Sequence, residues 1–363
     1  MMFARLKEPA RRRARRARGV FRQDLHDVAH LRRVLERERA RSDRTGDPFS
    51  FLIFTPRGKE FELATWRRLA KILKRRLRLT DDAGWLDGER IGVVLPHTPA
   101  SGAWKLADDV CLEFPPRTPP PLCEVYTYPT DWVDDERNDE TGDDTRRRDD
   151  AARQVDSLGV FFERPMPAWK RWLDVVGSGV GLIALAPLFL LVAIAIKIGS
   201  PGPVLFRQDR SGLGGRRFKM YKFRSMVAGA ERRQSELRAL NEQDGPAFKL
   251  TADPRVTRLG RFLRATSIDE LPQLWNVLLG EMSLVGPRPL PCAESDACES
   301  WQQRRMDVTP GLTCIWQVRG RSRVSFAEWV RMDLEYARSV SPATDIKILF
   351  QTVPAVLLRK GAK

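Results

Sequence analysis

The chain has 363 residues and a formal net charge of +16, so it is long enough for two domains and should meet an anionic partner: nucleic acid, membrane phospholipid or a phosphorylated substrate. Its five cysteines contain no Cys-x-x-Cys pair, which excludes a cysteine zinc site and a disulfide framework and fits a reducing cytosol. All three histidines lie at or before position 97, which excludes a Ser-His-Asp or Cys-His catalytic machine in the second half.

The chain begins with a basic arm, residues 1–23. Residues 1–22 hold nine Lys or Arg and one acid, and the apolar content is too low for a signal peptide. We expect a solvated, disordered arm. Attraction to an anionic membrane surface and binding to nucleic acid are the alternatives.

Residues 24–128 have the pattern of a compact α/β domain. The spacing of apolar residues predicts three helices and four strands in the order αβαββαβ. The helices are expected at His26–Arg41, Glu60–Leu79 and Ala100–Phe114, and the strands at Phe49–Thr55, Trp85–Leu86, Ile91–Leu95 and Cys123–Tyr128.

The wording of this domain, RERARSDRTGDPFSFLIF and IGVVLPHTP, resembles the nucleotidyl-cyclase-like domain of diguanylate cyclases. The hairpin that should carry the Gly-Gly-Asp/Glu-Glu-Phe signature has GWLDGERIG instead. The resemblance therefore implies a degenerate regulatory or scaffolding domain without cyclase activity. An unrelated small ferredoxin-like domain is the alternative.

An acidic, charged linker is expected at residues 129–165. Asp131–Asp150 carries ten acids and four arginines with almost nothing apolar, which predicts disorder and marks a domain boundary. The second domain then occupies residues 166–363.

The second domain begins with a segment of membrane character, residues 170–198. From Val175 to Ile196 there are 22 residues without a charge, enough to span a bilayer as a straight helix. Pro187 should kink that helix, and both flanks are basic, so the positive-inside rule does not orient it. We expect a re-entrant segment with both ends on the cytoplasmic side. A straight span and a buried core helix are the alternatives.

The segments that follow are expected to be short elements. Residues 203–226 predict two strands about the Gly-rich turn Gly212–Gly215, with seven basic residues and one acid between Val204 and Arg224. Glu231–Glu242 predicts a polar helix, and Phe326–Arg338 an amphipathic one. Ile346–Leu358 contains Pro354 and predicts a short apolar helix, either in the membrane interface or in the core.

Between the two predicted helices at 231–242 and 326–338 lies DPRVTRLGRFLRATSIDELPQLWNVLLGEMSLVGPRP. In this stretch Asp269 and Glu270 are surrounded by arginines. Because a helical proline is tolerated only in the first turn, Pro272 predicts that a helix begins near Asp269. Both carboxylates would then lie at the positive end of the helix, which lowers carboxylate pKa and attracts phosphate. Such a carboxylate can attack phosphorus, while its neighbour holds Mg²⁺. An acidic helix start with ordinary salt bridges is the alternative.

The order of motifs resembles the bacterial sugar transferase family, the monotopic polyprenyl-phosphate phosphoglycosyl transferases. After the apolar segment come GPVLFRQDRSGLGGRRFKMYKFRSM, the Asp-Glu stretch, PGLTCIWQVRGR and a terminal D-x-K-I-x-x-x-T. The resemblance implies an α+β chain, in which a ferredoxin-like or cyclase-like domain precedes a mainly helical membrane domain with a re-entrant helix.

The resemblance also implies roles for individual residues. Asp269 matches the nucleophile, and Glu270 matches its Mg²⁺-binding partner. Basic positions that match phosphate-binding or active-site residues of the family are Arg264, Arg288, Lys222 and Arg224.

The implied reaction moves a phosphosugar from a UDP-sugar to undecaprenyl phosphate through an aspartyl-phosphosugar intermediate, with release of UMP. It would be the first membrane step of exopolysaccharide, capsule or O-antigen synthesis, on the cytoplasmic face of a bacterial inner membrane. The expected partners are the two substrates and membrane lipid, with no nucleic acid, and a homodimer is compatible with the sequence. The sugar is not identified.

Two other classes of function stay open at this point. One is a membrane-anchored regulatory protein that senses a nucleotide through residues 24–128. The other is a basic nucleic-acid-binding protein, which is hard to reconcile with the 22-residue apolar run.

Overall fold

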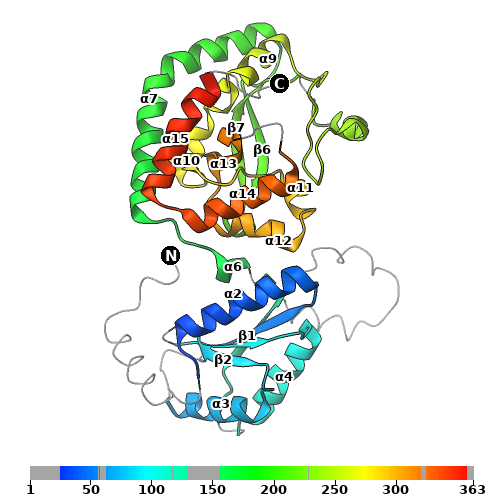
Figure 1. The fold of residues 1–363 in the computed structure, drawn as a ribbon, viewed down its shortest axis with the longest axis vertical. Helices are drawn as coiled ribbons and strands as arrows, with labels where there is room; N and C mark the ends of the chain where they lie inside the picture. The colour runs from blue at the N-terminus through cyan, green and yellow to red at the C-terminus, as the bar shows by residue number, and fades with distance from the viewer. Residues whose placement is uncertain are drawn as a thin grey trace. The chain divides into compact units, whose positions relative to one another are not determined.

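The computed structural model describes residues 25–55, 57, 63–87, 89–115, 118–129, 156–157, 159–227, 229–319 and 324–357. The chain divides into two compact units, Met1–Phe161 and Phe162–Lys363, and each is described by itself (Figure 1). The predicted basic arm at 1–23 and the acidic run Asp131–Asp150 lie outside the described residues.

The first unit confirms the predicted order αβαββαβ. Its helices and strands are α2 (Val28–Thr45), β1 (Phe49–Thr55), α3 (Leu63–Arg76), β2 (Asp82–Trp85), β3 (Ile91–Leu95), α4 (Ala100–Leu112), β4 (Leu122–Tyr128) and the short β5 (Asp156–Ser157). They form a five-stranded sheet in the order β2-β3-β1-β4-β5, antiparallel except where β5 runs parallel to β4.

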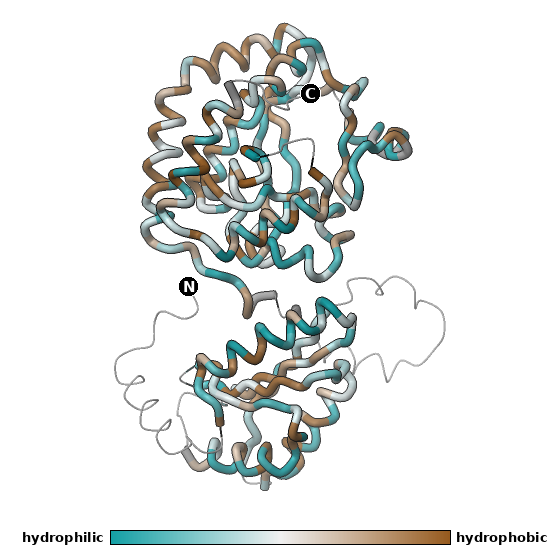
Figure 2. Tube along the Cα trace, in the orientation of Figure 1, coloured by the Kyte–Doolittle hydropathy of each residue, from teal (hydrophilic) through white to brown (hydrophobic). Residues whose placement is uncertain are grey.

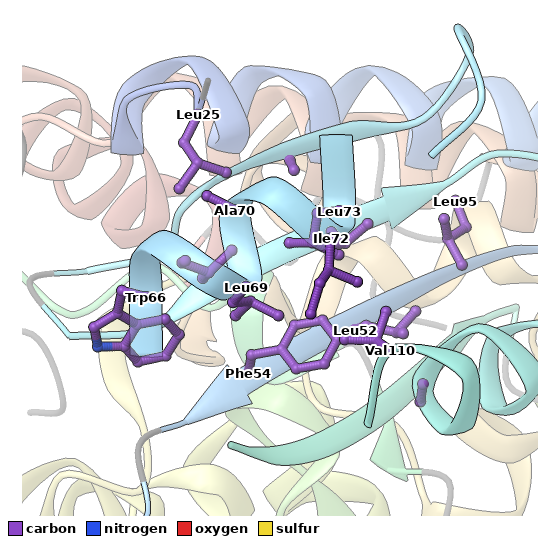
Figure 3. Close-up of a cluster of buried hydrophobic side chains, with 14 of the residues drawn as sticks. Leu25, Leu52, Phe54, Trp66, Leu69, Ala70, Ile72, Leu73, Leu95 and Val110 are labelled. Atoms are coloured by element: carbon purple, nitrogen blue, oxygen red, sulfur yellow. The ribbon is translucent and has the colours of Figure 1, made fainter. Parts of the chain in front are cut away.

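Both faces of β1 are buried, because helices cover the sheet on both sides. Leu52 and Phe54 pack against Trp66 and Leu69 of α3 and against residues of α4, as Figure 3 shows. Their neighbour Phe51 points to the opposite face, since successive side chains alternate across a strand. There it lies close to Leu31 of α2.

The second unit begins with α7 (Ala168–Gly199), a 32-residue helix that covers the whole predicted membrane segment. It is the one helix of the described residues that is long and apolar enough to cross a membrane. Most of its apolar side chains are exposed, which excludes the alternative of a buried core helix, and Figure 2 shows the apolar residues along it. Pro187 lies inside the helix, and Figure 1 shows that the helix bends.

The two ends of α7 pack against different parts of the same unit. Near its beginning, Asp174 accepts hydrogen bonds from Ser283 Oγ (3.0 Å) and from the backbone N–H of Leu284 (2.8 Å). Near its end, Val192 and Ile196 are buried in a cluster with Phe223 and Leu263. Both halves of the helix are therefore held by the folded unit.

The predicted strands about the Gly-rich turn are confirmed as the antiparallel pair β6 (Leu205–Ser211) and β7 (Arg217–Phe223), joined by a 3-10 turn, η1 (Leu213–Gly215). The expected polar helix at 231–242 is wrong in extent: only α8 (Gln234–Leu237) and the 3-10 turn η2 (Arg238–Leu240) are helical. No described apolar stripe binds that segment to the core, so propensity alone does not extend it.

The central stretch forms α9 (Arg258–Ala265), a 3-10 turn η3 (Ile268–Glu270) and α10 (Gln273–Leu279). The helix start predicted near Asp269 is present only as the 3-10 turn η3, and the α-helix begins later, at Gln273. Ser267 adopts a left-handed conformation between α9 and η3, and Pro272 is the N-cap of α10. A proline at that position loses no intrahelical hydrogen bond, and it leaves the two carboxylates in the tight turn before the helix.

The remaining elements complete the unit around a short parallel pair, β8 (Ser283–Val285) and β9 (Gly311–Thr313). The others are α11 (Cys292–Asp296), α12 (Ser300–Gln303), η4 (Arg304–Asp307), α13 (Ile315–Arg319), α14 (Phe326–Ser339) and α15 (Pro342–Leu357). The two predicted C-terminal helices are confirmed as α14 and α15, with Pro354 inside α15.

Candidate functional site

Glu270 is the centre of a charged cluster drawn from three separate segments. Arg288, which follows β8, holds both carboxylate oxygens in a bidentate pair, with Nη1 2.9 Å from Oε2 and Nη2 on Oε1. Lys222 of β7 donates to Oε1 over 3.3 Å. All three side chains are less than a fifth exposed. Planar bidentate pairs of this kind fix orientation as well as charge.

Asp269 lies beside this cluster and is 7 % exposed. Its carboxylate accepts no hydrogen bond from the described residues of the second unit. Nearby charges act on it without direct pairing: Glu270 opposes its ionisation, while Lys222 and Arg264 favour it. Asp269 is thus a buried carboxylate whose oxygens have no hydrogen-bond partner in the part of the chain that the structure describes.

The pKa values of the two neighbouring acids are shifted in opposite directions. Burial, and then the charge of Glu270, raise the pKa of Asp269 to about 6. Burial would also raise the pKa of Glu270, but Arg288 and Lys222 outweigh it and lower that pKa. The predicted lowering is therefore confirmed for Glu270 and wrong for Asp269, because among the described residues the direct cationic partners belong to Glu270.

The pKa values of the two basic partners of Glu270 are shifted as well. Burial lowers the pKa of Lys222 to about 8, against the opposing effect of Glu270. Burial would lower the pKa of Arg288 too, but Glu270 raises it. Glu270 and Arg288 therefore form a firmly ionised pair, and Lys222 is the group whose charge is most easily lost.

The predicted ring of arginines around the carboxylates is only partly present. Arg264, at the end of α9, is exposed and donates through Nε to Ser225 Oγ over 2.9 Å. Arg255 is buried in a pair with Asp253, while Arg258 and Arg261 are exposed.

Arg224 has contacts that differ from those of the other predicted basic residues. Its guanidinium donates to Pro201 O (2.9 Å), Ser200 O (2.7 Å) and Ser200 Oγ (2.9 Å). It thereby holds the C-terminal end of α7, where carbonyl groups attract a cation. The structure does not bring its charged group into direct contact with Glu270.

Two contributors were not predicted from the sequence. Asn276 of α10 is fully buried and clasps β7, donating to Lys219 O (2.7 Å) and accepting from Tyr221 N (3.1 Å), which positions Lys222 on that strand. A polar residue inside the apolar run LWNVLL was the available signal. Arg210 of β6 donates to Pro289 O over 2.9 Å, and burial lowers its pKa to about 10. No sequence signal separated it from the other basic residues of the hairpin.

A pocket of about 870 Å³ opens on this cluster. All six residues predicted from the sequence line it: Lys222, Arg224, Arg264, Asp269, Glu270 and Arg288. Arg210, Trp316 and Trp329 line it further along. The pocket combines aromatic surface with a surplus of positive charge, which suits an anionic ligand that carries rings.

The donor set fits Mg²⁺, which prefers carboxylate oxygens and keeps several waters. Within the described residues, Glu270 Oε2 accepts only one hydrogen bond and so retains a lone pair, and both oxygens of Asp269 are free of partners. Two adjacent carboxylates in the pocket wall are the groups that would hold the ion.

Comparison with known proteins identifies this half of the molecule. Residues 166–359 match the family described as Bacterial sugar transferase. The chain belongs to the bacterial sugar transferase family. This confirms the family that the motif order predicted.

Named relatives of this sugar transferase align over the same half. It is 46 % identical over 197 residues to the galactosyl transferase CpsE of Streptococcus agalactiae, covering 53 % of this chain and 43 % of the relative. It is 45 % identical to the UDP-glucose:undecaprenyl-phosphate glucose-1-phosphate transferase of Caulobacter vibrioides, covering 53 % and 71 %. It is 42 % identical to the exopolysaccharide production protein ExoY of Sinorhizobium fredii, covering 53 % and 87 %.

Solved structures are similar to this sugar transferase at a lower level. The diguanylate cyclase SiaD of Pseudomonas aeruginosa matches with a TM-score of 0.25 and 22 % identity, covering 35 % of this chain and 53 % of that one. A TM-score of 0.25 is too low to support a shared fold, so the cyclase-like nature of the first unit stays a prediction.

Proposed function

We propose that the protein transfers a phosphosugar from a UDP-sugar to undecaprenyl phosphate and so begins the assembly of an exopolysaccharide, capsule or O-antigen. The names of the relatives support the substrates and the pathway class. The observation that carries the chemistry is the position of Asp269, a buried carboxylate without a hydrogen-bond partner among the described residues, in a pocket rich in fixed cations. The alternative of a nucleotide-sensing protein is not favoured, because the family is one of transferases.

In the first step, one oxygen of Asp269 attacks the phosphorus that carries the sugar. The bond from that phosphorus to the oxygen of UMP breaks, and UMP leaves with the electron pair. In the second step, an oxygen of undecaprenyl phosphate attacks the same phosphorus, and Asp269 leaves as a free carboxylate. Splitting the transfer in this way turns one difficult displacement into two easier ones.

The remaining residues of the site orient and balance charge. Arg288 and Lys222 hold Glu270 ionised and fixed next to Asp269. Arg264 stands exposed at the pocket, where it can meet a phosphate oxygen. Mg²⁺ held by Glu270 and Asp269 would supply neutralisation of the diphosphate charge. Fixed cations at the position where charge develops commonly supply the largest part of such a rate enhancement.

The membrane arrangement belongs to the same proposal. One substrate is soluble and the other is trapped in a leaflet, so the enzyme must stay at the interface. A bend in α7 and packing of both its halves on one folded unit support a re-entrant helix with both ends on the cytoplasmic side of the bacterial inner membrane. Exposed apolar residues of α15, Ile346 and Phe350, would lie in the interface.

The test is release of UMP. Purified protein in nanodiscs would receive Mg²⁺, undecaprenyl phosphate and either UDP-glucose or UDP-galactose. We expect UMP from at least one donor, and none above background from Asp269→Asn. Asp209→Asn is the matched control. Asp209 lies exposed on β6 and pairs with Lys219 of β7, so this variant should release UMP like the wild type. Normal turnover by Asp269→Asn would overturn the nucleophile assignment.

A further inference from the structure

Two of the three histidines of the chain lie together in the first unit, far in sequence from the transferase half. The rings of His26 and His30 stack with centroids 4.0 Å apart and planes inclined by 17°. Asp82, at the start of β2, places Oδ1 3.3 Å from Nε2 of His26. One ligand atom from each of the three residues lies within 4.8 Å of the other two.

The backbone fixes this juxtaposition. His26 runs alongside the edge strand β2, donating its N–H to Ala83 O (3.0 Å) and accepting from Trp85 N (2.9 Å). Gly84 permits this approach, because a Cβ there would lie 2.9 Å from His26 O. His30 is held in the first turn of α2, where its N–H meets the capping carboxylate of Asp27 at 2.7 Å.

We propose that His26, His30 and Asp82 bind one divalent transition-metal ion such as Zn²⁺. Two imidazole nitrogens and one carboxylate oxygen are a common ligand set for such ions, with water at the open position. Zn–N bonds of about 2.0–2.1 Å place two ligand nitrogens roughly 3.4 Å apart, so the stacked rings of His26 and His30 must rotate out of their parallel arrangement before both can donate to one ion. His26 is 45 % exposed, which leaves a route for the ion and room for water.

The surroundings of Asp82 are consistent with this assignment. Its second oxygen, Oδ2, lies 3.6 Å from Nη2 of Arg37, so the two oxygens have different partners and Oδ1 is the one directed at His26. Magnesium does not favour imidazole ligands, so this site would not compete for the ion of the transferase pocket.

Binding would join the beginning of α2 to the edge strand of the sheet. β2 ends the sheet on one side, and the segment that contains His26 covers its outer edge. An ion that binds only the folded unit stabilises it by mass action. We infer that the site acts as a metal clip for this unit.

The chain contains its own control. His97 pairs with Asp47 at the same 3.3 Å distance, but this pair has no second histidine. A histidine-carboxylate pair alone is a weak metal ligand, so His97→Gln should leave metal binding unchanged, whereas His30→Gln should not. His30→Gln keeps the backbone N–H that meets Asp27.

The experiment uses the full chain, purified in detergent, stripped with a chelator and titrated with ZnCl₂ by calorimetry. We expect each chain to bind one Zn²⁺ ion tightly. The dissociation constant should be at least tenfold larger in His30→Gln and in Asp82→Asn. Zn²⁺ should also raise the unfolding temperature of the wild type more than that of His30→Gln. Circular dichroism of the metal-free variants should match the wild type, which separates lost ligation from misfolding.

Equal Zn²⁺ affinity in the wild type and both site variants, or no tight binding at all, would overturn the proposal. Asp269→Asn should bind Zn²⁺ as the wild type does. A failure of the transferase proposal would therefore leave this result unaffected, and the reverse also holds.

Discussion

Lys170 and Lys222 are both lysines with little exposed surface that donate to a carboxylate, yet their surroundings differ. Lys170 uses all three of its donors, on Asp345 Oδ2 (2.5 Å), Val285 O (2.9 Å) and Tyr336 Oη (3.0 Å). Tyr336 also donates to Asp345 Oδ1 over 2.8 Å, and Asp345 is fully buried. Every donor of Lys170 in this cluster is therefore used on a buried partner.

The cluster around Lys222 is open and its charges are not matched. Lys222 and Arg288 share Glu270, while no described residue pairs directly with Asp269, and the group faces a pocket of about 870 Å³. The comparison shows that a buried lysine-carboxylate pair is not by itself a functional sign. A pair with every donor used holds elements together, whereas one that leaves a carboxylate free beside surplus cations can do chemistry.

The largest expected effect comes from breaking the open cluster. Arg288→Met removes the bidentate partner of Glu270 and should lower the rate of UMP release by about 10²–10³-fold, as loss of a charge-stabilising group typically does. Arg217→Met is the control, because Arg217 is exposed and forms a long ion pair, 3.6 Å, with the exposed Asp296. Activity of Arg288→Met within twofold of the wild type would contradict the role given to Glu270.

Breaking the cluster around Lys170 should cost stability instead of rate. Lys170→Met leaves Asp345 buried without its cation and should lower the free energy of unfolding by about 3–5 kcal/mol, measured by denaturant titration in detergent. UMP release per folded molecule should stay within twofold. The double variant with Asp345→Leu should recover part of the loss, because the uncompensated charge is removed; no recovery would argue against the ionic explanation.

A smaller effect is expected where helix α9 touches the site. Gly260 lies against Ser225, and a Cβ there would be 1.9 Å from Ser225 O. Gly260→Ala should therefore push α9 away, displace Arg264, and cost roughly 1–3 kcal/mol together with some activity. Gly179→Ala is the control, because nothing lies within 4 Å of its Cβ and alanine favours a helix interior. Equal stability of the two variants would contradict the close packing.

The smallest effect concerns pH. Because the proposed attack needs ionised Asp269, whose pKa is raised to about 6, kcat/KM should fall as pH drops through about 6. Lys222 lowers that pKa, so Lys222→Met should move the acid limb to higher pH, measured by initial rates of UMP release. A limb that stays in place would show that Lys222 does not act on Asp269.

The same shift has a consequence for stability. Between pH 3.8, the ordinary pKa of an aspartate, and about pH 6, the folded chain holds a proton on Asp269 that the unfolded chain has released. The contribution of this group to stability therefore declines as pH rises through that window, and Asp269→Asn should remove the dependence.

The sequence by itself determined the family, the Asp-Glu pair, the apolar segment with its proline and the order of elements in the first unit. These depend on motif order, residue type and local periodicity, all of which are written along the chain. Asn276 is a polar residue in an apolar helix, and this pattern could have indicated its structural role from the sequence alone.

Only the tertiary structure decided which arginine meets Glu270. Arg255, Arg264 and Arg288 look alike in sequence, but the first pairs with Asp253, the second with Ser225, and only the third with Glu270. The fold also decided that Asp269 has a raised pKa. Burial and long-range pairing depend on where α9, β7 and the segment after β8 meet, and local sequence does not contain that distance information.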